Sequence, residues 1–159
     1  MSQQVGGKMS WQTIKTIRDK WSGKLILKGI LSQQDAIKAQ KLGVDAIIVS
    51  NHGGRQLDKV PSAVSVLSEL DKSLFNKDYL VFDSGIRSGG DIVSSLASGA
   101  DFVFLGRPFL YALASGGKQG VDYLIEKLIK ELSNTAQLLG CMVVDDIDSK
   151  YVVERTRNI

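Results

Sequence analysis

The residues best suited to chemistry lie in one stretch, Ser50 to Asp58, which holds His52, the only histidine of the chain. The stretch follows an apolar run, Ala46 to Val49, as expected for a buried strand that ends in a polar loop. An imidazole moves protons near neutral pH. Arg55, three residues later, carries a guanidinium, which grips a carboxylate through two parallel hydrogen bonds. The pair favours chemistry on a small carboxylic acid.

His52 and Arg55 also have simpler interpretations. A histidine after a strand is more often a loop residue than a catalyst, and a single arginine is usually a solvated surface charge. The chemical interpretation therefore needs further residues that the fold brings to the same place.

The rest of the chain alternates strand-like and helix-like segments. Short apolar runs bounded by glycine or polar residues predict four strands, at 25–28, 46–49, 79–83 and 101–105. Amphipathic spacing predicts helices at 11–21, 32–42, 62–70, 90–98 and 121–139, and Pro108 is expected to begin one more. The tail, 142–159, is polar and weakly patterned.

One order of residues occurs twice in this alternation. The strings 41–46 and 97–102 each run from a helix end through a glycine to a strand start, as a repeated βα unit does. The sequence therefore predicts a single α/β domain over residues 1–159 with four parallel βα units. Such units form either a small doubly wound sheet or half of an eight-unit barrel, and in both the site lies at the carboxyl ends of the strands.

The other strand ends also carry charges and glycines. Lys28 closes the first strand; alone it is an exposed lysine at a strand tip, but in a site its ammonium would stabilise an anion. The third strand runs into loop 83–91, with three glycines and one arginine, and the fourth ends at Gly-Arg-Pro, 106–108. Glycine-freed amides, helix N-termini and guanidinium groups attract anions. These loops predict a phosphate bound between Gly85, Arg87, Gly106 and Arg107.

Four strings, in this order and spacing, resemble the FMN-dependent α-hydroxy-acid dehydrogenase and oxidase family: Leu27–Ile30, Ser50–Asp58, Asp83–Arg87 and Gly106–Tyr111. The similarity covers nearly the whole chain and is greatest to the L-lactate dehydrogenase branch, through residues 83–87 and 106–114. It implies a (β/α)8 TIM barrel that binds FMN and oxidises a small 2-hydroxy acid, L-lactate, to the 2-oxo acid. In such enzymes the flavin carries the redox chemistry while the protein supplies orientation and charge.

The resemblance also implies a role for each matching residue. His52 corresponds to the base that takes a proton from the 2-hydroxy acid, and Arg55 to the residue that binds its carboxylate. Lys28 corresponds to the lysine that stabilises negative charge on the reduced flavin ring, and Ser50 to a flavin contact. The loops that bind the ribityl chain and phosphate of FMN are matched by Asp83, Ser84, Gly85, Arg87, Gly106 and Arg107.

The resemblance covers only the C-terminal half of that barrel, strands five to eight. The family's first four strands carry a substrate-binding tyrosine and the aspartate that orients the active-site histidine. We therefore expect the chain alone to be inactive, with the other half absent or supplied by a separate chain. The alternative is a non-catalytic remnant or assembly subunit that keeps an FMN- or phosphate-binding half-barrel. Another phosphate-binding barrel, such as a nucleotide dehydrogenase, fits less well because its catalytic cysteine loop is missing.

A half-barrel leaves two strand edges and one sheet face open. The open face is expected to carry a set of apolar residues: Leu25, Leu27, Ile47 or Ile48, Val81 and Val103. Burying apolar surface contributes about 25 cal/mol per Å². We therefore expect a homo-oligomer, or pairing with a separate N-terminal half, rather than a lone monomer.

Composition excludes several other classes. The chain has 159 residues, of which 43% are hydrophobic and 23% charged, and its net charge of +3 is too diffuse for a nucleic-acid partner. The single cysteine, Cys141, excludes an internal disulfide and a multi-cysteine metal site; no metal is expected, and the thiol should pack near a helix end. No signal peptide or membrane span is visible. A cytoplasmic location is expected, with peripheral association at the inner face of the cell membrane left open.

Overall fold

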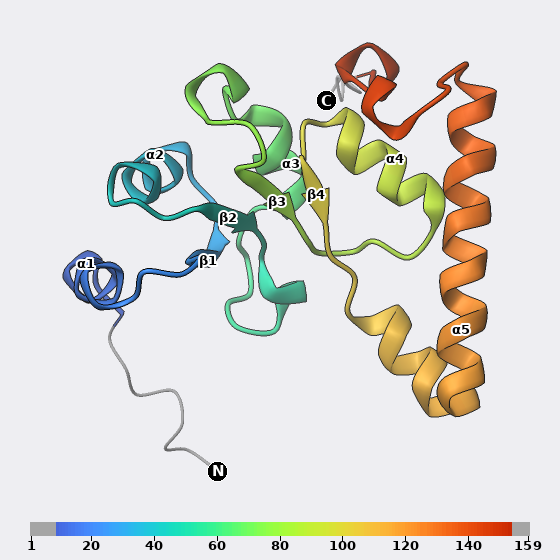
Figure 1. Ribbon diagram of the computed structural model, residues 1–159, viewed down its shortest axis with the longest axis horizontal. Coiled ribbons are helices and arrows are strands. Elements are labelled where there is room, and N and C mark those ends of the chain that lie inside the picture. Colours follow the sequence, from blue (N-terminus) through green and yellow to red (C-terminus); the bar gives the residue numbers. More distant parts are fainter. Residues whose placement is uncertain (1–8, 154–159) are drawn as a thin grey trace.

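Residues 9–153 are described by the computed structural model, in which one parallel four-stranded sheet is flanked by helices (Figure 1). The strands lie side by side in chain order: β1 (Ile26–Ile30), β2 (Ala46–Val49), β3 (Leu80–Phe82) and β4 (Phe102–Val103). A doubly wound sheet reverses its strand order at a switch point, whereas the strands of a βα barrel follow one another. The observed order therefore selects the second predicted architecture, four consecutive units of a barrel.

Four helices begin where the sequence places a serine. α1 (Trp11–Lys20), α2 (Gln33–Lys41), α3 (Ala63–Glu69) and α4 (Gly89–Ala97) follow the N-cap residues Ser10, Ser32, Ser62 and Ser88. Each hydroxyl accepts a hydrogen bond from a backbone amide three residues on, which satisfies a donor that the helix leaves unpaired. These helices match their predicted bounds to within one residue, whereas β3 and β4 are shorter than predicted. β1 ends two residues later than predicted, so Lys28 lies within the strand and does not close it. No helix within residues 9–153 is long and apolar enough to cross a membrane.

The last helix, α5 (Arg107–Leu138), is interrupted at Gly117, where φ is 55° and ψ is −140°. Figure 1 shows the chain reversing its direction there, so two helical segments follow β4, as predicted from Pro108 and from residues 121–139. The second segment packs against α4 in a separate apolar cluster that includes Val93, Ala136 and Cys141. The cysteine is buried directly after the helix end, as predicted. Two short turns, η3 (Val144–Asp146) and η4 (Ser149–Tyr151), complete the described chain.

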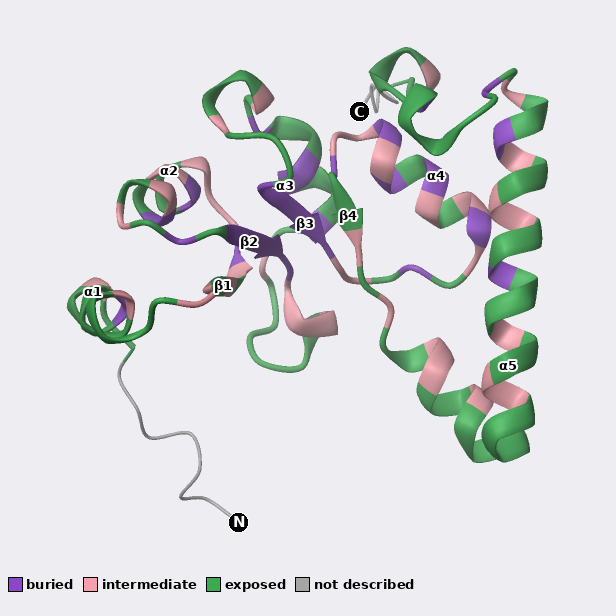
Figure 2. Cartoon of the chain, viewed as in Figure 1, coloured by how far each residue is buried: buried purple, intermediate pink, exposed green. Residues whose placement is uncertain are grey.

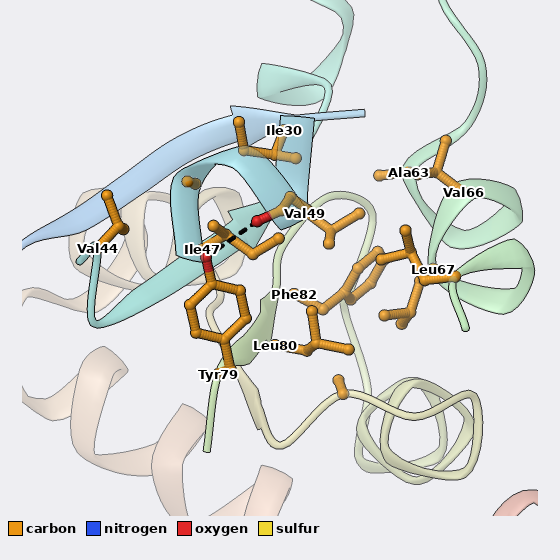
Figure 3. Packing of buried hydrophobic residues seen from close by; sticks show 14 of the residues in the cluster. Ile30, Val44, Ile47, Val49, Ala63, Val66, Leu67, Tyr79, Leu80 and Phe82 are labelled. Atoms are coloured by element: carbon orange, nitrogen blue, oxygen red, sulfur yellow. Dashed lines mark hydrogen bonds between the residues drawn. The ribbon is translucent and has the colours of Figure 1, made fainter. Parts of the chain in front are cut away.

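The main core lies between the sheet and the helices on its outer face. Ile47, Val49, Leu80 and Phe82 point into it from β2 and β3, the two strands that are buried along their whole length (Figures 2 and 3). Tyr79 is fully buried in the same cluster, and its phenol Oη donates to the backbone carbonyl of Ala36 at 3.1 Å. Burial raises the pKa of Tyr79, so the phenol stays a neutral donor.

The inner face of the sheet, away from these helices, carries a smaller apolar set of cross-strand neighbours: Ile26, Ala46, Ile48, Val81 and Phe102. The predicted membership was right for Ile48 and Val81. It was wrong for Leu25, Leu27 and Val103, which pack against the outer core because side chains alternate along each strand. The inner face is open at its edges, since 48% of Ile26 and 59% of Phe102 are exposed.

Two aspartates each join one pair of neighbouring strands at their amino ends. Asp45, just before β2, accepts a hydrogen bond from the Leu25 amide at 2.8 Å, and its own amide donates to the Leu25 carbonyl at 2.9 Å. Asp101, just before β4, makes the same two bonds with Leu80, at 2.8 and 2.7 Å. The glycine two residues before each aspartate has a positive φ, 79° and 98°, which turns the chain from helix into strand. The repeated string of the sequence is thus a repeated structural device, the strand clamp.

Candidate functional site

The carboxyl ends of the four strands surround one pocket. Nine of the ten residues predicted for the site line it: Lys28, His52, Arg55, Asp83, Ser84, Gly85, Arg87, Gly106 and Arg107. The tenth, Ser50, is fully buried and bonds to two of the nine. Parallel strands place their carboxyl ends at one edge of a sheet, which is why residues so far apart in the sequence meet.

Ser50 joins the ends of β1 and β2. Its Oγ accepts hydrogen bonds from the Lys28 Nζ at 2.8 Å and from the His52 amide at 3.0 Å. The Lys28 ammonium also donates to the carboxylate of Asp83, at the end of β3. Lys28 is therefore tied to residues that follow β2 and β3, and 40% of its side chain stays exposed at the mouth of the pocket.

The Asp83 carboxylate is ionised in this setting. Burial raises its pKa, but the hydrogen bond and charge of Lys28 and the hydroxyls of Ser50 and Ser84 outweigh burial, so the pKa lies below the ordinary value of 3.8. The pocket thus pairs its one lining carboxylate with Lys28 and leaves its other cations for a ligand.

His52 opens a short 3₁₀ turn, η1 (His52–Gly54), with a φ of 54° that side-chain-bearing residues rarely adopt. The turn is pinned on both sides: the Gly53 amide donates to Asn51 Oδ1 at 3.0 Å, and the Asn51 amide donates to Ser84 Oγ at 3.3 Å. Ser84 has a positive φ as well, 104°. Strained residues of this kind persist only where their surroundings hold them, and they cluster at functional sites.

Arg55 lies at the rim of the same pocket. Its Nε donates to the His52 carbonyl at 3.3 Å, which ties the guanidinium to the histidine turn. The side chain is otherwise exposed, so its terminal N–H groups face solvent. A carboxylate bound there would lie next to the imidazole.

The far side of the pocket suits an anion. Within residues 9–153, neither Arg87 nor Arg107 has a carboxylate within 4.0 Å. A Cβ at Gly85 or Gly106 would meet nothing within 4 Å, so a ligand has room to approach either backbone. α5 begins at Arg107, and its N-cap Gly106 has no side chain to cap it. Pro108 has no amide and the Phe109 amide donates to the Gly106 carbonyl at 3.1 Å, so the Arg107 amide and the positive dipole end of the helix remain for an anion.

The start of α4, which was also predicted to attract an anion, differs from the start of α5. Its amides are taken by protein groups: those of Arg87 and Ser88 donate to Asp91 Oδ2, at 2.9 and 3.0 Å, and that of Gly89 donates to Glu131 Oε2 at 2.9 Å. The glycine at 89 permits close packing on α5 instead. A phosphate in this pocket would therefore rely on the start of α5 and on the two guanidinium groups.

The pocket is small and partly apolar. Its volume of about 150 Å³ is below the roughly 300–1,000 Å³ of sites that enclose a cofactor-sized molecule. Sequence patterns missed its apolar wall, which is formed by Ile86, Phe104, Leu105, Pro108 and Leu110. Strand-end apolar residues carry no signal of their own, because the same residue types fill the core. Residues 9–153 include no group of three or more metal-binding side chains.

A parallel βα sheet with cations and open glycines at its carboxyl ends defines the class of phosphate-binding βα barrels. Comparison with known proteins makes the assignment specific: the family model described as FMN-dependent dehydrogenase matches residues 1–154. The chain belongs to this family, as the four sequence motifs predicted.

Individual relatives agree in sequence and fold. The chain is 43% identical over 145 residues to an L-lactate dehydrogenase of Bartonella tribocorum and 41% identical over 157 residues to a peroxisomal (S)-2-hydroxyacid oxidase of Arabidopsis thaliana. These matches cover 91% and 99% of this chain, but 38% and 43% of the relatives. The crystal structure of mandelate oxidase with (S)-2-phenylpropionate matches with a TM-score of 0.83 at 38% identity, over 87% of this chain and 42% of that one. The chain spans about two fifths of the length of the relatives it matches.

The residues present fit FMN, the cofactor of this family. Two guanidinium groups, an uncapped helix start and two glycines facing open space provide for a phosphate. Lys28 provides a cation at the opposite side of the same pocket. The small volume fits part of the cofactor rather than the whole.

Proposed function

We propose that this chain forms the C-terminal part of an FMN-dependent dehydrogenase that oxidises L-lactate or a similar 2-hydroxy acid to the 2-oxo acid. One observation carries the proposal: His52, Arg55 and Lys28 line a single pocket with two arginines that have no described acidic partner. The names of the relatives, an L-lactate dehydrogenase and an (S)-2-hydroxyacid oxidase, support the substrate class.

Each side chain has a task that follows from its chemistry. FMN, when bound, would accept the hydrogen of C2 together with the two electrons of its bond, the equivalent of a hydride. Arg55 holds the substrate carboxylate by parallel hydrogen bonds, and His52 takes the proton of the C2 hydroxyl as the carbonyl forms. Lys28, kept in place by Ser50 and Asp83, offsets negative charge that develops on the cofactor side.

The proposal includes a second wall for the site. The pocket leaves most of a flavin uncovered, and the inner sheet face and both strand edges are open. Four further parallel βα units, from a separate N-terminal half or from a second copy, would cover them. Without that wall we expect the chain alone to show little or no lactate oxidation, because removing the group that orients a catalytic histidine costs about 10⁴-fold in comparable enzymes.

The test combines flavin binding with flavin reduction. The chain is coexpressed with the N-terminal half of a family member and purified without added cofactor; yellow colour and anaerobic bleaching by L-lactate are the expected result. His52→Gln should keep the colour and abolish the bleaching, while Lys130→Ala, an exposed change on α5, should leave both intact. Colour without bleaching would support a non-catalytic FMN-binding remnant, and neither colour nor bleaching would refute the proposal.

A further inference from the structure

Gly29 occupies an unusual position in β1, next to Lys28. The register of β1 against β2 shifts between Lys28 and Ile30, so Gly29 forms a bulge in the strand. Its φ is 94°, a conformation that residues with a side chain rarely adopt. Bulges re-aim side chains near functional sites.

The space beside Gly29 is filled by the histidine of the site. A Cβ at Gly29 would lie 2.7 Å from Nε2 of His52 and 3.5 Å from its Cε1, closer than ordinary contact at the first of these atoms. The imidazole therefore lies directly against the backbone of β1, at a point where only glycine leaves room for it.

We propose that Gly29 is a positioning residue for His52: the missing side chain is what allows the ring to lie against the strand end, within the pocket. This inference rests on the proposed function of His52 as the base. The turn that carries the ring is fixed by the bond from the His52 amide to Ser50 and by the left-handed φ of 54°, so the imidazole can yield only by rotating about its own side-chain torsions. A methyl group at Gly29 displaces the imidazole from the end of β1 while leaving its chemical identity unchanged.

The position of the imidazole can be followed by nuclear magnetic resonance. His52 is the only histidine, so the imidazole resonances of the untagged chain come from this site alone. Gly29→Ala should move the Cε1–H resonance by more than its linewidth. The matched control is Gly140→Ala, at the end of α5, where φ is 77° and a Cβ meets nothing within 4 Å. This control introduces a comparable backbone strain without a contact and should leave the resonance in place.

A double-mutant cycle separates the contact from backbone strain. His52→Asn removes the atoms that meet the new methyl group and tolerates a positive φ. Gly29→Ala should therefore lower the melting temperature by several degrees more in the wild-type background than in the His52→Asn background. Equal losses in both backgrounds, including failure of both to fold, would overturn the proposal, as would an unmoved imidazole resonance. FMN titration of the same variants, each coexpressed with the N-terminal half of a family member, keeps the two hypotheses apart: a complex that binds no flavin counts against the proposed function, whereas the cycle still tests the contact.

Discussion

Gly89 and Gly90 are adjacent in sequence and should respond in opposite ways to the same substitution. A Cβ at Gly89 would lie 2.2 Å from the backbone nitrogen of Leu132 and 2.5 Å from the carbonyl carbon of Glu131. A Cβ at Gly90 would meet only Ser88 Oγ, at 3.7 Å. Alanine at 89 therefore forces α4 and α5 apart, while alanine at 90 fits the first turn of α4.

The expected magnitudes follow from these distances. Carbon contacts are optimal near 3.5–4.0 Å, so α5 must retreat by roughly 1 Å, and its backbone cannot rotate away as a flexible side chain would. Overpacking costs typically 1–3 kcal/mol, and an obstacle of backbone atoms places Gly89→Ala near the upper end, about 3 kcal/mol. At roughly 2–4 °C per kcal/mol, this lowers the melting temperature by about 6–12 °C. Gly90→Ala should be neutral or stabilise by up to about 1 kcal/mol, since alanine loses less backbone entropy on folding.

Thermal melts of the two variants, followed by circular dichroism, measure the difference. Titration with inorganic phosphate adds a second readout, because Gly89 belongs to the loop whose glycines were predicted to approach a ligand. If Gly89 packs α4 on α5, its alanine variant loses stability, and phosphate affinity should remain in the fraction that stays folded. Equal melting temperatures for the two variants, or a loss confined to phosphate binding, would refute the reasoning.

Three further predictions concern the anion pocket, the strand clamp and assembly. Arg107→Ala should weaken FMN binding about tenfold, because one charge-assisted hydrogen bond contributes about 1.5 kcal/mol. Riboflavin binding should stay unchanged, because riboflavin lacks the phosphate. Equal loss of affinity for both ligands in a fluorescence titration would exclude a phosphate contact. The pKa of Asp45 is lowered from 3.8 to about 2, chiefly by the Leu25 amide and by Lys24. The contribution of Asp45 to stability is therefore present above about pH 4 and lost as the pH falls toward 2. Asp45→Asn should flatten this part of an acid unfolding curve, and an unchanged curve would show that the strand clamp does not cause the loss of stability in this pH range. Light scattering on the purified chain should give a mass above that of one copy, or a complex with a coexpressed N-terminal half, because Ile26 and Phe102 are open on the inner face; a stable monomer at micromolar concentration would contradict this.

The strand-end residues were predictable because parallel βα units obey a simple rule. All strands of such units have their carboxyl ends at the same edge of the sheet. The position of a polar residue that follows an apolar run can therefore be predicted from the run alone. Lys28, His52 and Arg107 needed no further information to be placed together. The serine caps and the glycines after helices fixed the helix bounds for a similar reason, since they act within three or four residues.

Which face a strand side chain occupies could not be predicted. The strand runs are apolar at successive positions, as in Ala46 to Val49, so they lack the alternation that distinguishes a buried face from a wet one. Leu27 and Ile48 were therefore assigned to one face, although they point to opposite ones.

The packing role of Gly89 could not be predicted from the neighbouring residues in the sequence either. One clue was present: Ser88 and Asp91 have the spacing of a capping box, which satisfies the start of α4 without a ligand. The partner of the Gly89 amide, Glu131, lies 42 residues away and becomes visible only when α4 and α5 are packed. The room that Gly29 leaves for His52 is of the same kind, because it depends on the relative placement of two strands.

The strand clamps have a consequence for how the chain reaches its fold. Leu25 and Asp45 are 20 residues apart, and Leu80 and Asp101 are 21 apart, so each clamp closes within about one βα unit. The entropy of loop closure grows only slowly with length, and contacts of short sequence separation form early. Each clamp can therefore register its strand pair as soon as that unit leaves the ribosome, before the following units exist. The clamps lie at the amino ends of the strands, opposite the pocket, so we expect strand pairing to depend on residues that take no part in the chemistry.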